Sequence, residues 1–81
     1  MTAEDIRQLI VTGMPGAEVQ VFGDDGRHFQ AVIVSPAFAG LMPVRRHQLV
    51  YAALGDAMKE AVHALSISTH TPEEWAARSA G

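Results

Sequence analysis

The sequence contains no cysteine among its 81 residues. This chain alone can therefore supply no disulfide, no thiol nucleophile and no thiolate ligand for a metal. Aromatic residues make up only 6% of it, and it has no run of like charges and no low-complexity tract. The 48% hydrophobic content is that of a globular domain. A chain of this length can bury one core and not two, so a single domain over residues 1–81 is expected.

Long hydrophobic runs are also absent. No stretch approaches the roughly 18 apolar residues of a membrane span, and the N-terminal "MTAEDIRQLI" is acidic and amphipathic, unlike a basic leader with an apolar core. These features predict a cytoplasmic protein with no membrane contact. The net charge of −3 opposes binding to a phosphate backbone, and the only adjacent basic pair is Arg45-Arg46.

Capping signals and alternation predict the elements of the N-terminal half. Thr2 followed by Asp5 approximates a capping box, and the apolar residues after it share one helical face, which predicts a helix from Ala3 to Thr12. The segment "AEVQVFGDDGRHFQAVIVS" contains two alternating runs around the turn signal "GDDG", which predicts a hairpin. A serine and a proline, Ser35-Pro36, then favour one helical turn before Gly40.

The C-terminal half starts with a longer helix at Pro43, through "PVRRHQLVYAALGDAMKEA". Apolar residues and one histidine recur there at spacings of three and four and form one stripe, predicted to face the core: Val44, His47, Tyr51, Leu54 and Met58.

A last strand and a last helix follow. In "AVHALSISTH" the side chains of Leu65 and Ile67 share parity with His63, so His63 lies on the more apolar face of the predicted strand. Thr71-Pro72 and the capping-box acid Glu74 then predict a terminal helix, with Trp75 as its one large apolar side chain. The order α-β-β-α-α-β-α predicts an α+β domain, with a three-stranded sheet and the helices packed on one face.

Two segments resemble the BolA family: "SPAFAGLMPVRRHQLVYAAL", residues 35–54, and "VHALSISTHTPEEW", residues 62–75. The short acidic hairpin loop is most similar to the IbaG-like branch, and the resemblance spans nearly the whole chain. It implies a fold similar to the type II KH topology, in agreement with the order above. It also implies a function in iron-sulfur trafficking or iron sensing, as a partner of a monothiol glutaredoxin in a heterodimer that bridges a [2Fe-2S] cluster. Some members are described as DNA-binding regulators of morphology and stress response.

His63 and His28 are the candidate ligands. From the residues alone, His63 is either a histidine bonded to a backbone carbonyl or one presented for chemistry. The resemblance implies that it ligates the cluster, while the cysteine of the glutaredoxin and a glutathione supply the thiolates, and that the isolated chain holds no cofactor. The family has a Cys or His in the hairpin loop, but "GDDGR" offers neither. The nearest imidazole, His28, is then the second ligand or an exposed strand-end residue, with Asp24 or Asp25 as oxygen-donor alternatives.

The other candidates have simpler interpretations. His70 is predicted at about 23 Å from His63 along the strand and on its opposite face, so it is a surface residue rather than a co-ligand. His47 is predicted to be a buried, hydrogen-bonded histidine that ties the long helix to the sheet. Tyr51 and Trp75 are predicted to be structural. Arg45 and Arg46 are either a solvated helix start or a contact to an acidic protein surface, glutathione or nucleic acid.

Catalysis has little support. The sequence has no nucleophile with a plausible base, no Gly-rich phosphate loop and no acid pair committed to one site, so a non-enzyme is expected. The alternative function is a KH-like nucleic-acid-binding regulator. The absence of a "GxxG" loop of the KH kind between the helices weakens this alternative. A third is an interaction module without metal.

Overall fold

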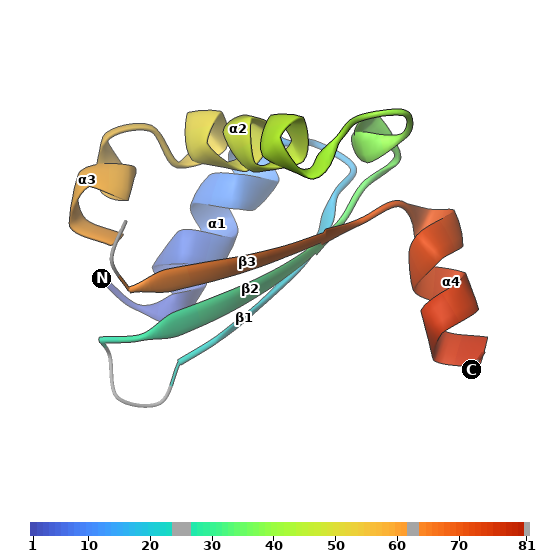
Figure 1. Cartoon of the computed structure of the whole chain (residues 1–81). Helices are drawn as coiled ribbons and strands as arrows, with labels where there is room; N and C mark the ends of the chain where they lie inside the picture. Colours follow the sequence, from blue (N-terminus) through green and yellow to red (C-terminus); the bar gives the residue numbers. More distant parts are fainter. Residues whose placement is uncertain (24–26, 62–63, 81) are drawn as a thin grey trace.

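The computed structural model describes residues 1–23, 27–61 and 64–80 (Figure 1). Three strands form one sheet in the order β1-β2-β3, with β1 antiparallel to β2 and β2 parallel to β3. The elements in chain order are α1 (Ala3–Gly13), β1 (Glu18–Phe22), β2 (Phe29–Val34), the 3-10 turn η1 (Pro36–Phe38), α2 (Pro43–Leu54), the 3-10 turn η2 (Gly55–Ala57), α3 (Met58–Ala61), β3 (Leu65–His70) and α4 (Pro72–Ala80). The predicted α+β fold and element order are confirmed.

Helix α1 begins where its capping box predicts. The Thr2 hydroxyl accepts from the Asp5 backbone N–H at 3.1 Å, and the Asp5 carboxylate accepts from the Thr2 backbone N–H at 2.9 Å. This pairing satisfies two of the backbone donors that a helix start leaves open. Ile6 and Ile10 of the same helix are fully buried. They place α1 against the sheet face that carries the core.

The sheet buries one parity of its strands. Val19 in β1 and Phe29, Ala31 and Ile33 in β2 are buried against α1 and α2, together with Phe38 of η1. The alternate residues of β1, such as Glu18 and Gln20, are exposed. This period of two is the expected pattern for a sheet covered on one face. The predicted turn at Asp24 and Asp25 lies outside the described residues.

The long helix predicted from Pro43 is interrupted at Gly55. Its φ of +57° lies in the left-handed region, and it ends α2 before η2 and α3. The predicted core stripe of α2 is also wrong in part, because Val44 is 68% exposed and Tyr51 40% exposed. Val50 and Leu54 are the buried residues of α2. The helix carries apolar side chains on two faces, and only one of them meets the core.

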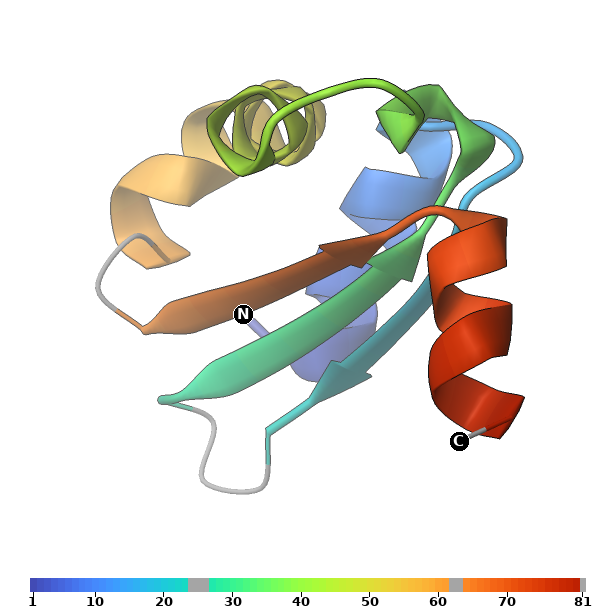
Figure 2. The same ribbon diagram turned by 45° about the vertical axis from the view of Figure 1, so that its right-hand side comes forward.

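Helix α4 stands apart from α1 and α2, at the end of the sheet where β3 finishes (Figure 2). The predicted cap is present: the Glu74 backbone N–H donates to the Thr71 hydroxyl, and the Thr71 N–H donates to the Glu74 carboxylate. Trp75 lines a hollow with Val32 and Val34, with Val32 on the parity opposite to the core residues. Among the helices, α4 therefore contacts the other face of the sheet, which refines the prediction that all helices share one face. None of the described helices is long and apolar enough to cross a bilayer.

Candidate functional site

The parallel pairing of β2 and β3 brings the starts of these two strands together. Phe29, the first residue of β2, is the register partner of Leu65, the first residue of β3. The Phe29 backbone N–H donates to the Ala64 carbonyl oxygen at 2.7 Å. The residues that precede both strands are therefore neighbours, although 36 positions separate Phe29 from Leu65 in the register. His28 directly precedes β2, and Ala64 directly precedes β3.

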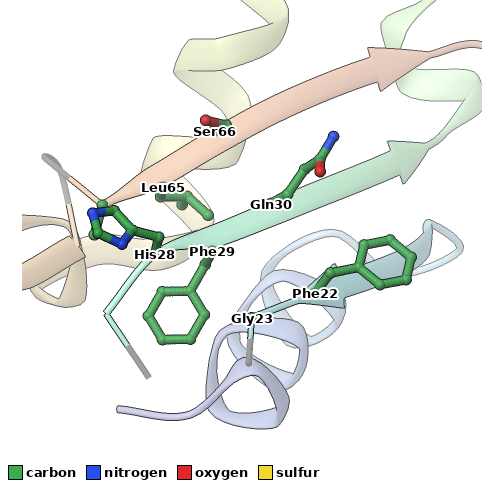
Figure 3. A pocket seen from close by; sticks show the side chains of 8 residues that line it. Phe22, Gly23, His28, Phe29, Gln30, Leu65 and Ser66 are labelled. Atoms are coloured by element: carbon green, nitrogen blue, oxygen red, sulfur yellow. The ribbon is translucent and has the colours of Figure 1, made fainter. Parts of the chain in front are cut away.

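A hollow of about 600 Å³ lies at this end of the sheet. Figure 3 shows the imidazole of His28 reaching toward the start of β3, while the ring of Phe29 points away from it. His28 is exposed, whereas Phe29 is only 7% exposed and belongs to the core. The residues that line the hollow come from the ends of all three strands: Phe22, Gly23, His28, Phe29, Gln30, Ala64, Leu65 and Ser66.

His63 lies outside the described residues, as do Asp24 and Asp25, so the structure leaves their predicted ligand roles as predictions. His63 is the residue before Ala64 in the sequence. In the part of the chain that the structure describes, no group of three or more His, Asp or Glu side chains could hold a metal ion. The chain also has no cysteine. Among the described residues that line the hollow, His28 is the one imidazole.

His70 belongs to a structural contact at the opposite end of β3. Its Nε2 lies 2.7 Å from the Ser68 hydroxyl oxygen, and its ring lies 5.0 Å from the Trp75 ring between centroids. The Arg78 guanidinium lies 5.7 Å from the centroid on Trp75. These contacts hold α4 against the end of the sheet, in agreement with a structural role for Trp75.

His47 is half-buried, and its ring meets that of Tyr51 edge-on at 6.1 Å within α2. The prediction of a buried, hydrogen-bonded histidine that ties α2 to the sheet is wrong: within the described residues, His47 makes no hydrogen bond through its ring. The reason is the rotation of α2, which points Val50 and Leu54 at the core and leaves His47 at the margin of that face.

The two arginines have different environments. The Arg46 guanidinium forms a two-point ion pair with Glu74, at 2.7 Å and 3.2 Å, and its Nε donates to the Leu41 carbonyl oxygen at 2.9 Å. Its side chain is 13% exposed and lies 5.9 Å from the Phe38 ring centroid. The hydrogen bonds from Arg46, with the one from the Thr71 backbone N–H, lower the pKa of Glu74 to about 2. Arg46 is thus engaged within the fold, and Arg45 is exposed.

Sequence reasoning missed two residues of this hollow and one long-range contact. Phe22 is 56% exposed and lines the hollow, and the alternation of β1, in which Val19 and Val21 face the core, could have indicated its outward direction. Gly23 follows it, and a glycine opposite an aromatic residue in a hairpin is a recognisable signal. The Arg46–Glu74 pair joins residues 28 positions apart, and no local pattern predicts it.

The comparisons with known proteins agree with the fold. A family model described as BolA-like protein matches residues 13–74. Acid stress protein IbaG of Escherichia coli K12 is 36% identical over 94% of this chain and 90% of its own length. The DNA-binding transcriptional regulator BolA of Vibrio cholerae is 50% identical over 59% of this chain and 45% of its own length.

Among solved structures, a BolA homologue from Coxiella burnetii superposes with a TM-score of 0.82 at 45% identity, covering 94% of this chain and 97% of that one. The chain spans less than half the length of the first curated relatives it matches. The resemblance predicted from the sequence, and its similarity to IbaG, are confirmed.

Proposed function

This chain belongs to the BolA-like family, and from that premise we propose that it is a non-enzymatic adaptor that co-ligates a [2Fe-2S] cluster with a monothiol glutaredoxin. The role is in assembly or trafficking of such clusters or in the sensing of iron. The proposal assigns His63 as one ligand and His28 as the second, and it assigns the thiolates to the glutaredoxin cysteine and a glutathione.

The observation that carries the proposal is the hydrogen bond from the Phe29 N–H to the Ala64 carbonyl oxygen. It joins the residue after His28 to the residue after His63. The parallel pairing of β2 and β3 therefore holds Phe29, which follows His28, beside Ala64, which follows His63 in the sequence. His28 and Ala64 both line the hollow.

The donor set fits this chemistry. Iron of a [2Fe-2S] cluster accepts imidazole in place of thiolate, as in Rieske centres, and this exchange raises the reduction potential. A chain without cysteine can take part only by giving imidazole or oxygen ligands, and nitrogen suits iron better than a carboxylate in such clusters. The open hollow, with exposed Phe22 at its rim, leaves His28 accessible to a second protein.

The test is anaerobic mixing with a cluster-loaded monothiol glutaredoxin. The visible absorption and circular dichroism of the cluster should change on adding the wild-type protein, and His63→Ala should abolish the change. His28→Ala should alter the new spectrum. His47→Ala is the matched control, because His47 lies on α2 and does not line the hollow. A His63→Ala protein that behaves like wild type would contradict the ligand assignment.

A second candidate function is nucleic-acid binding, since the V. cholerae relative carries the name of a DNA-binding transcriptional regulator. Of the adjacent pair Arg45-Arg46, Arg45 is the exposed one, because Arg46 is paired with Glu74. DNA binding that weakens steeply with salt and is lost in Arg45→Ala would favour this function over the adaptor role.

A further inference from the structure

The hairpin between β1 and β2 contains an unusually close contact beside His28. Gly23 directly follows β1 and lines the same hollow as His28. The register pairs Phe22 with Gln30, so Gly23 is next in line with Phe29 across the hairpin. Its φ is not in the positive range found at Gly16, Gly40 and Gly55. Backbone conformation therefore does not explain a glycine at this position.

The lack of room for a side chain does explain the glycine at position 23. A Cβ atom at Gly23 would lie 2.6 Å from Cδ1 of Phe29 and 2.8 Å from the carbonyl oxygen of His28, well short of ordinary contact at 3.4 Å or more. Neither neighbour can turn aside easily. The Phe29 ring is packed in the core, and the His28 oxygen belongs to the backbone. Any side chain at position 23 would have to displace the Phe29 ring and the carbonyl oxygen of the peptide between His28 and Phe29.

That peptide is held from both sides. Gly23 packs on one side through the His28 carbonyl and the Phe29 ring, and Ala64 accepts the Phe29 N–H on the other. We infer that Gly23 is a positioning residue: its missing side chain sets the distance from the His28 imidazole to the start of β3. The inference rests on the proposed function, because this distance matters most if His28 ligates the same cluster as the proposed ligand His63.

The test compares two glycine substitutions of equal steric severity. In Gly23→Ala the new Cβ would meet atoms at 2.6 Å and 2.8 Å, and in Gly13→Ala it would meet Cβ and Cα of Ala53 at the same two distances. Gly13 lies at the contact of α1 with α2 and does not line the hollow. Both proteins should lose thermal stability, and all comparisons are made below both unfolding transitions. Only Gly23→Ala should change the surroundings of His28.

The first measurement needs no cluster. The imidazole carbon-bound proton signals of the four histidines are recorded by NMR, and His28 is assigned through its loss in His28→Ala. Gly23→Ala should shift the His28 signals while leaving those of His70, at the other end of the sheet, in place. Gly13→Ala should leave His28 unmoved. Unchanged His28 signals in Gly23→Ala, or equal shifts in both variants, would overturn the inference.

The second measurement uses the heterodimer with glutaredoxin. Gly23→Ala should change the cluster spectrum in the direction of His28→Ala and weaken cluster retention about tenfold, as is typical when support of a ligand is lost. In a His28→Ala background it should have no additional effect on the spectrum. An additive effect there would overturn the inference. A wild-type protein that leaves the glutaredoxin spectrum unchanged would overturn the proposed function instead, and the NMR comparison would still decide the role of Gly23.

Discussion

At the residue scale, Glu74 combines two contacts that are usually separate. Its carboxylate completes the cap of α4 by accepting the Thr71 N–H at 2.8 Å, and it also receives the Arg46 guanidinium at two points. A planar guanidinium matches a carboxylate in this way, whereas the ammonium of a lysine cannot. The Glu74 carboxylate therefore joins the start of α4 to Arg46 of α2, and the Nε of Arg46 in turn donates to the Leu41 carbonyl oxygen.

This arrangement predicts an acid-dependent stability. The pKa of Glu74 falls from 4.5 to about 2 in the folded protein, first through Arg46 and then through the Thr71 N–H. A carboxyl whose folded pKa is depressed contributes stability above its unfolded pKa and loses it as pH falls toward the folded pKa. Glu74→Gln keeps an acceptor for the cap but removes the ion pair. It should lower the unfolding temperature at pH 6, and its difference from wild type should shrink between pH 4.5 and pH 2.

The control for this prediction is Glu73→Gln, one residue earlier on the same helix turn. Glu73 is exposed and makes no ion pair among the described residues. It should follow the wild-type pH dependence of the unfolding temperature. A Glu74→Gln protein whose deficit stays constant from pH 6 to pH 2 would show that the ion pair adds nothing to the cap.

At the element scale, α2 is a helix with apolar side chains on more than one face. Periodicity placed Val44 and Leu54 on one stripe, yet Val44 is exposed and Leu54 is buried. The close approach of Gly13 to Ala53 fixes which face of α2 meets α1. A period of 3.6 residues shows that a helix is amphipathic, but with apolar residues on two faces it does not say which face is covered.

Two substitutions on α2 test its rotation. Leu54→Ala should reduce the free energy of unfolding by about 2–5 kcal/mol, because it removes a core side chain and leaves a cavity. Val44→Ala should change it by no more than about 0.5 kcal/mol, since this side chain is largely in solvent. Chemical denaturation of both variants measures the difference. Equal losses would mean that Val44 is covered in solution and that the predicted stripe was correct.

At the scale of the whole molecule, the sequence predicts the features that depend on neighbouring residues, but not the contacts between distant segments. The order of elements could be predicted because its signals depend on neighbours within four residues. These signals are the helix caps at Thr2 and Thr71 and the Ser35 cap of the turn η1 after the hairpin. The ion pair of Arg46 and the side of the sheet that Trp75 contacts depend on chain segments far apart. His28 was a candidate by elimination, and only the pairing of β2 with β3 brings it next to Ala64.

The two ends of the sheet thus have different surroundings. The candidate ligand hollow lies where β2 and β3 begin, and α4 with Trp75 packs where β3 finishes. The six residues of β2 separate these ends by about 17 Å at roughly 3.3 Å per residue. A change at one end should reach the other only through the shared strands.

Trp75→Ala tests this separation. The half-buried indole contacts the His70 ring and lines a hollow with Val32 and Val34. Its removal should therefore reduce the free energy of unfolding by about 0.5–3 kcal/mol. The His28 imidazole signals and the spectrum of the glutaredoxin mixture should remain those of the wild type, while the His70 signals shift. Were Trp75→Ala to disturb His28 as strongly as Gly23→Ala does, the sheet would be transmitting strain along its length, because close-packed strands have few voids to absorb a displacement.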